Sequence, residues 1–155
     1  TAAAQAAAGV SLAQGTLYVE WSNIGIQLAL AQVLLSLRAD DNNRIHFRSP
    51  HTSDKVTLFI TTGGVVQATL ASANAAVGSV PYKSAMAYTT NDVAARYTSS
   101  LGADPINSIS AAMPTGSFVL WIGNNNSGNS GNSLITRITW WPQRLPDGAL
   151  DSLRA

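Results

Sequence analysis

Apolar and polar residues alternate with a period of two along most of this chain, which is the pattern of strands that bury one face. The first clear run is residues 15–21, where Leu17, Val19 and Trp21 share one parity. This run predicts the first strand of a sheet.

A second pair of runs, 33–39 and 44–49, is separated by the polar segment 40–43 (Asp-Asp-Asn-Asn). Asp and Asn tolerate left-handed backbone angles and bond to their own backbone, so this segment predicts a hairpin turn. In the return run, two apolar residues alternate with Arg44, His46 and Arg48. One face of this hairpin is therefore predicted to be solvated or to line a groove.

The remaining runs complete an all-β pattern. Gly63 and Gly64 separate two of them and suit the positive φ angles of a tight hairpin turn. The runs that follow the first hairpin are 56–62, 65–70, 83–89, 93–98, 117–122 and 134–141, and one helix is expected at 147–153. Their spacing predicts an antiparallel two-sheet sandwich with one short C-terminal helix.

The length of 155 residues suits one domain, which we place at 15–155 after an Ala-rich linker or lead-in at 1–14. Because the chain begins without Met, we expect it to be a piece of a longer protein. Its net charge of +1 comes from scattered basic residues without a basic stripe, which argues against nucleic acid as a partner. It has no cysteine, which excludes disulfides. Polar residues interrupt the longest apolar stretch, 24–37, so we expect no membrane insertion.

Several short motifs resemble, in order, the laminin-G-like, concanavalin A-like lectin/glucanase modules of bacteriophage tail fibre and tailspike proteins. They lie at 15–21, 43–45, 63–70 and 85–92, and a closing signature comprises Ile122-Gly123 and 141–145 (Trp-Pro-Gln-Arg-Leu). The resemblance implies a jelly-roll sandwich. The chain departs from the family at 97–105, where we expect a longer loop, and at the last helix, where Asp147 is predicted to be the N-cap without a capping box.

This resemblance implies a non-catalytic domain that binds host-surface glycan, with bacterial surface polysaccharide as the partner. It also implies a homotrimer in an extracellular tail fibre or tailspike of the virion. The alternative is a domain that caps or trimerises the fibre tip without binding glycan.

Catalysis is not expected. Glycosidases of this fold use paired carboxylates in one cleft, whereas Glu20 is the only glutamate and most aspartates fall in turns or in the last helix. Neither His46 nor His51 lies near a nucleophile signature, so both are read as strand-surface or turn residues. Asp40, Asp41 and the two asparagines that follow offer oxygen ligands for calcium, but a plain Asx-rich turn, the favoured interpretation, explains the same residues without an ion; no metal site and no cofactor are assigned.

Aromatic residues carry the functional argument, because sugar rings stack on indole faces. Leu120 and Ile122 have core parity, so Trp121 is predicted to point outward, as a sugar platform or as a subunit contact. Trp141 is the expected core residue and Trp140 the surface ring. The predicted ligand-binding residues are Trp121, Trp140, Asn124, Asn125, Asn126 and Arg96. Arg44, His46 and Arg48 could supply groove polarity, although such residues are more often only solvated surface.

Overall fold

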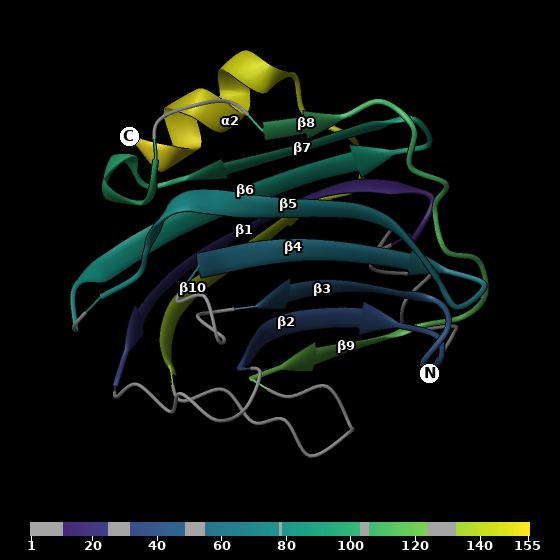
Figure 1. Cartoon of the computed structure of the whole chain (residues 1–155), viewed down its shortest axis with the longest axis horizontal. Coiled ribbons are helices and arrows are strands. Elements are labelled where there is room, and N and C mark those ends of the chain that lie inside the picture. Colours follow the sequence, from purple (N-terminus) through teal and green to yellow (C-terminus); the bar gives the residue numbers. More distant parts are fainter. Residues whose placement is uncertain (1–10, 25–31, 49–54, 78, 103–105, 124–132) are drawn as a thin grey trace.

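Ten strands form two antiparallel sheets in the computed structural model, which describes residues 11–24, 32–48, 55–77, 79–102, 106–123 and 133–155. Sheet A has the order β10-β1-β6-β7-β8 and sheet B the order β5-β4-β3-β2-β9. In Figure 1 sheet B faces the viewer, and β1 and β10 of sheet A pass behind it. The strands are β1 (Gln14–Asn23), β2 (Val33–Arg38), β3 (Arg44–Arg48), β4 (Lys55–Thr62), β5 (Val65–Ala75), β6 (Pro81–Thr89), β7 (Asp92–Tyr97), β8 (Ile106–Ser108), β9 (Val119–Ile122) and β10 (Ser133–Trp141).

The facing sides of the two sheets form the main core, and the apolar parity that the sequence shows in the first run lies there. Leu17, Val19 and Trp21 of β1 are all buried on the inner face of sheet A. Sheet B contributes Leu35, Leu37, Ile45, Phe47, Leu58 and Ile60. The all-β prediction is confirmed because period-two runs become strands whose apolar parity is removed from water.

The predicted hairpins are confirmed by their turn geometry. Gly63 and Gly64 between β4 and β5 have φ angles of 58° and 81°, and Asn91 between β6 and β7 has φ 59°. In the turn between β2 and β3, Asp40 Oδ1 accepts hydrogen bonds from the backbone N–H groups of Asn42 and Asn43 at 2.7 and 2.8 Å. These local bonds set the register of sheet B.

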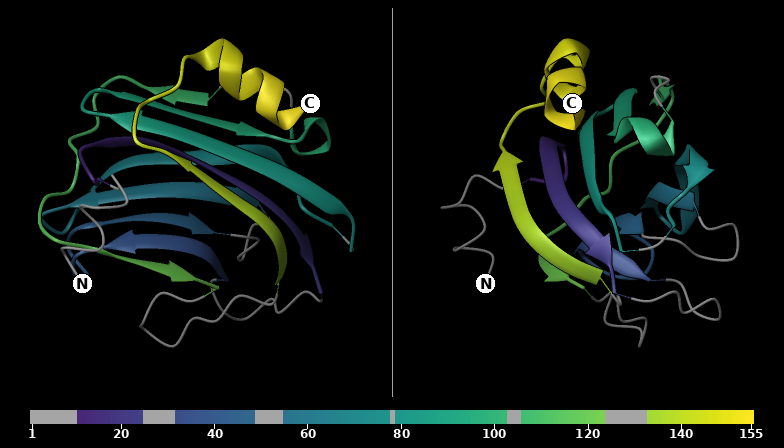
Figure 2. Two further views of the ribbon diagram at one scale, coloured as in Figure 1. Left: turned by 180° about the vertical axis from the view of Figure 1, so that it is seen from behind. Right: turned by 90° about the vertical axis from the view of Figure 1, so that its left-hand side faces the viewer.

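A short helix, α2 (Asp147–Arg154), lies on the outer face of sheet A, away from sheet B (Figure 2). Leu150 is fully buried there against a small cluster that includes Tyr18, Ala85 and Ala94. The prediction of Asp147 as N-cap is wrong: Pro146 holds the N-cap position with extended angles, and Asp147 is the first helical residue. Docking of Leu150 therefore compensates for the missing side-chain cap.

The segment after β7 contains structure that the alternation did not predict. A 3₁₀ turn, η1 (Ser99–Leu101), follows β7, and the three-residue strand β8 then pairs with β7. A strand this short carries no detectable period.

The expectation of a core position for Leu120 and Ile122 is also wrong. Both have the inward parity of Leu37 and Leu35, their partners on β2, but β9 is the edge strand of sheet B. They are 38% and 55% exposed because β9, in the part of the chain that the structure describes, packs mainly against β2.

Candidate functional site

The outer face of sheet B carries partly exposed aromatic rings beside buried polar and basic side chains. Strand register places one residue from each strand in a row across this face: Thr69 (β5), Phe59 (β4), His46 (β3), Ser36 (β2) and Trp121 (β9). Phe59 and Trp121 are partly exposed rings, whereas His46 and Ser36 between them are buried. No pocket is found among the described residues, so this candidate site is a surface between two rings.

Three arginines flank this row. Arg48 lies on one side, with its guanidinium carbon 4.6 Å from the centre of the Phe59 ring. Arg38 and Arg44 are cross-strand partners on the other side. Both contact the exposed Asp41, at 2.5 and 3.4 Å. The face therefore combines aromatic surface with positive charge.

Several polar atoms of this face are buried without a hydrogen-bond partner in the described residues. They are both ring nitrogens of His46, which is 1% exposed, Oγ of Ser36 and Nε of Arg48. Buried polar groups in native proteins are nearly always bonded, and each exception calls for an explanation. These four atoms lie in adjacent rows of one face; the other such atoms in the described residues belong to Asn23, Ser133, Trp140, Arg144 and Asp147.

Burial is the main cause that lowers the pKa of His46 to about 3, and the charges of Arg44, Arg48 and Arg38 act in the same direction. The imidazole is therefore neutral at physiological pH, and the positive charge of the face belongs to its arginines.

This shift predicts a specific pH dependence. Below pH 6.5 the unfolded chain binds a proton on His46 that the folded protein does not bind, so the free energy of unfolding falls as pH decreases toward 3. Between pH 7.5 and pH 5 the expected loss is about 2 kcal/mol. Urea unfolding of the wild type and of His46→Gln measures it. The same pH dependence in both proteins would contradict the assignment, since His51 is present in each.

The sequence-predicted site residues fall in different places. Trp121 lies on the outer face of sheet B, in the row described above. Asn124, Asn125 and Asn126 lie outside the described residues. Trp140 and Arg96 belong to other parts of the sandwich, and each has a structural environment of its own.

Trp140 faces the interior between the sheets. Its ring packs against the main core and lies 6.0 Å from the Tyr88 ring, centre to centre. Trp141 is instead the one that faces outward, against the cluster beneath α2. The expected roles of the two tryptophans are therefore reversed, because β10 pairs with β1 in a register that places Trp140 opposite the inward Leu17.

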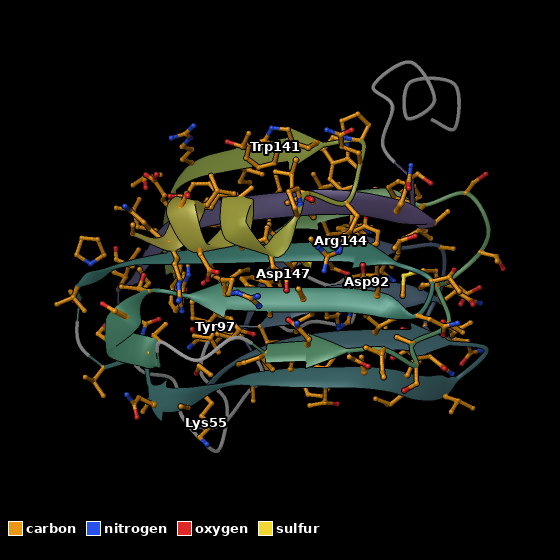
Figure 3. All side chains as sticks on the ribbon, turned by 90° about the horizontal axis from the view of Figure 1, so that it is seen from above. Lys55, Asp92, Tyr97, Trp141, Arg144 and Asp147 are labelled. Atoms are coloured by element: carbon orange, nitrogen blue, oxygen red, sulfur yellow. The ribbon has the colours of Figure 1, made fainter. Side chains whose placement is uncertain are left out.

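Arg96 is 2% exposed and lies beneath α2 on the outer face of sheet A. Its guanidinium donates to Asp147 at 2.9 Å, to Asp151 at 3.0 Å and to Asn107 at 2.9 Å. The nearby Arg144 pairs with Asp92 and Asp147 at 2.7 and 2.6 Å, and Figure 3 shows these three side chains together beside α2. In the structure, Arg96 holds the helix to the sheet and lies on the opposite sheet from Trp121.

Sequence reasoning assigned no role to Phe59, Ser36 or Arg38, and it mentioned Arg44, His46 and Arg48 only as groove polarity. The parity of each strand was readable, but a row across five strands requires the register, which no single strand carries. Figure 3 shows Lys55, at the start of β4, on the opposite side of the sandwich from Trp141.

The described acidic residues have structural partners. Glu20 accepts a hydrogen bond from the Tyr18 hydroxyl at 2.7 Å and pairs with Arg137. Backbone hydrogen bonding to Asn42 is the main cause that lowers the pKa of Asp40.

No cluster of three His, Cys, Asp or Glu side chains that could hold a metal occurs in the described part of the chain, and calcium at the 40–43 turn stays a prediction. Among the described residues, no helix has the length and apolar character needed to cross a lipid bilayer.

No protein-family model and no curated protein sequence matches the chain. Several solved structures do match the chain. The CBM40 of the Ruminococcus gnavus IT-sialidase bound to α2,3-sialyllactose has TM-score 0.72 at 17% identity, over 97% of this chain and 86% of that one. Domain 4 of AbnA, a GH43 extracellular arabinanase from Geobacillus stearothermophilus, in complex with arabinotriose, has TM-score 0.73 at 11% identity, over 92% and 67%.

Mouse laminin α1 chain domains LG4-5 have TM-score 0.62 at 10% identity, over 86% of this chain and 36% of that one. These likenesses establish the fold. The chain is a concanavalin A-like, jelly-roll β-sandwich, as the resemblance of its motifs implied.

Proposed function

We propose that this domain is a non-catalytic carbohydrate-binding module that recognises glycan through the outer face of sheet B. The observation that carries the proposal is the row from Phe59 to Trp121, in which two partly exposed rings flank buried polar groups without partners. Rings bind the flat C–H faces of sugars, and the arginines that flank the row offer N–H donors to the hydroxyls.

The similar structures support this proposal. Two of them contain sugars, sialyllactose and arabinotriose, and they share the sandwich at TM-scores of 0.72 and 0.73. We further propose, from the motif resemblance, that the domain belongs to an extracellular phage tail fibre or tailspike and binds bacterial surface polysaccharide. Assembly as a homotrimer would then convert weak single-site contacts into useful avidity.

Replacing Trp121 by alanine tests this function. We expect affinity for a bound glycan to fall about tenfold, or 1.4 kcal/mol, because the variant loses the ring face that stacks on sugar. The measurement is a glycan array of bacterial polysaccharides followed by titration with the best ligand, with light scattering to follow the subunit number.

Leu120→Ala is the matched control, since Leu120 is adjacent on β9 and has the opposite, inward parity. Its affinity is expected to match that of the wild type. No binding of the wild-type protein anywhere on a broad array, or equal losses in both variants, would argue against the proposed face.

The alternative is a structural role in capping or trimerising the fibre tip. The exposed apolar side chains of edge strand β9 favour it: Val119 is 50%, Leu120 38% and Ile122 55% exposed. This role predicts that Leu120→Ala or Trp121→Ala dissociates an oligomer, with no glycan affinity in any variant.

A further inference from the structure

We infer that the ligand of the outer face of sheet B is an acidic glycan, and that Arg48 is the residue that binds its carboxylate. This inference rests on the proposed function and deepens it, because it names the chemical class of the sugar and the side chain that selects it.

Arg48 differs from the other two arginines of this face. Arg38 and Arg44 both contact the Asp41 carboxylate, whereas no carboxylate among the described residues pairs with Arg48. Its Nε is buried and has no hydrogen-bond partner there. A guanidinium without a carboxylate partner offers N–H donors in a planar arrangement that matches the two oxygens of a carboxylate.

The Arg48 side chain is also held in position. Its guanidinium lies over the Phe59 ring, 4.6 Å from the ring centre, and a cation over an aromatic face is attracted to it. Holding the fork in advance reduces the conformational entropy lost when a ligand binds. Phe59 in turn is partly exposed, so a sugar ring can contact it next to the guanidinium.

The charge of the surroundings favours an anion. Arg38, Arg44 and Arg48 flank the row with Asp41 as the one carboxylate that pairs with them in the described residues, and the buried His46 between them is neutral. Burial and the charge of Arg44 lower the pKa of Arg48, which shows that its positive charge is incompletely compensated. A carboxylate beside the exposed part of the Arg48 guanidinium would supply that compensation.

The geometry also argues for a sugar acid rather than a free inorganic anion. The guanidinium is bordered by the Phe59 ring, and Trp121 continues the same face across two strands. An inorganic anion would bind to the guanidinium and make no contact with the aromatic rings. A uronic or sialic acid residue would place its carboxylate on the guanidinium and its sugar ring on an aromatic ring.

The test compares polysaccharides that differ in the carboxylate. Polygalacturonate and polysialate are titrated into the full chain beside carboxyl-reduced polygalacturonate, which keeps the sugar backbone, and dextran sulfate, which carries charge of another kind. We expect an acidic polymer to bind at least tenfold more tightly than the carboxyl-reduced one, and Arg48→Gln to remove this preference. Arg48→Lys, which keeps the charge without the fork, is expected to restore it only in part.

Arg137→Gln is the matched charge control, because Arg137 lies on sheet A and its side chain is 58% exposed. It should bind like the wild type, and thermal unfolding verifies that each variant is folded. Equal affinity for the acidic and reduced polymers would overturn the inference and leave the proposed function standing. Binding to none of the array glycans or these polymers would overturn both.

Equal binding of dextran sulfate, reduced to the same extent in Arg48→Gln and Arg137→Gln, would mean attraction by general charge and would overturn the role of Arg48.

Discussion

Replacing Arg96 by alanine is expected to lower the free energy of unfolding by about 3 kcal/mol. The guanidinium is buried and bonds to Asp147 and Asp151 of α2 and to Asn107 of β8. Its loss leaves two helix carboxylates facing each other at the sheet surface without their shared partner. The expected cost is at the lower end for a broken buried pair, because Arg144 and Arg154 also pair with these aspartates.

Urea unfolding measures this effect, with Arg137→Ala as the control. The Arg137 side chain is 58% exposed and its nearest contact with Glu20 is 3.6 Å, so its loss should change stability by less than about 0.5 kcal/mol. Arg96→Ala should keep wild-type glycan affinity under conditions where it is folded. Unchanged stability together with lost affinity would return Arg96 to the binding site that the sequence alone suggested.

Replacing Gly15 by alanine is expected to cost about 3 kcal/mol of stability, at the upper end for added volume in a packed interior. A Cβ at position 15 would lie 2.1 Å from Cη2 of Trp140 and less than 3 Å from two more of its ring atoms. Gly15 lies between Trp140 on β10 and Tyr88 on β6, and its missing side chain lets the two rings approach across β1. Any added atom must displace an indole that the core holds.

A double-mutant cycle with Trp140→Leu identifies the cause. In the Trp140→Leu background the Gly15→Ala change should cost less than about 0.5 kcal/mol, because the indole that it meets is gone. Trp140→Leu should itself leave glycan binding unchanged, since this ring faces the interior. An equal cost of Gly15→Ala in both backgrounds would show that Trp140 does not lie over Gly15.

The sequence was sufficient for the fold because the signals involved are local. The alternation through 15–21 and the glycine pair at Gly63 and Gly64 state which residues form strands and where the chain reverses. The structure confirms the two-sheet sandwich with one C-terminal helix. Trp121 was placed on the correct face of β9 for the same reason, since parity along one strand is local.

Parity along one strand could not predict how exposed the residues of an edge strand are, or that a short edge strand forms. Leu120 and Ile122 have core parity, but burial also depends on what packs over the strand, and among the described residues β9 packs mainly against β2. The short strand β8 forms because β7 presents an open edge to it. Neither the exposure of the β9 residues nor the formation of β8 can be predicted from the residues of that strand alone.

Arg48 and Arg96 show which properties the sequence determines and which the tertiary structure decides. Each is an arginine that alternates with apolar residues on a strand, and each points away from the sandwich interior, so parity alone treats them alike. The sequence by itself determined the strands, the turns and the parity. The tertiary structure decided that α2, about fifty residues further along the chain, covers Arg96 with two carboxylates, while no such helix covers Arg48 among the described residues. The physical reason is that parity names the face of a strand, whereas long-range packing decides what lies against that face.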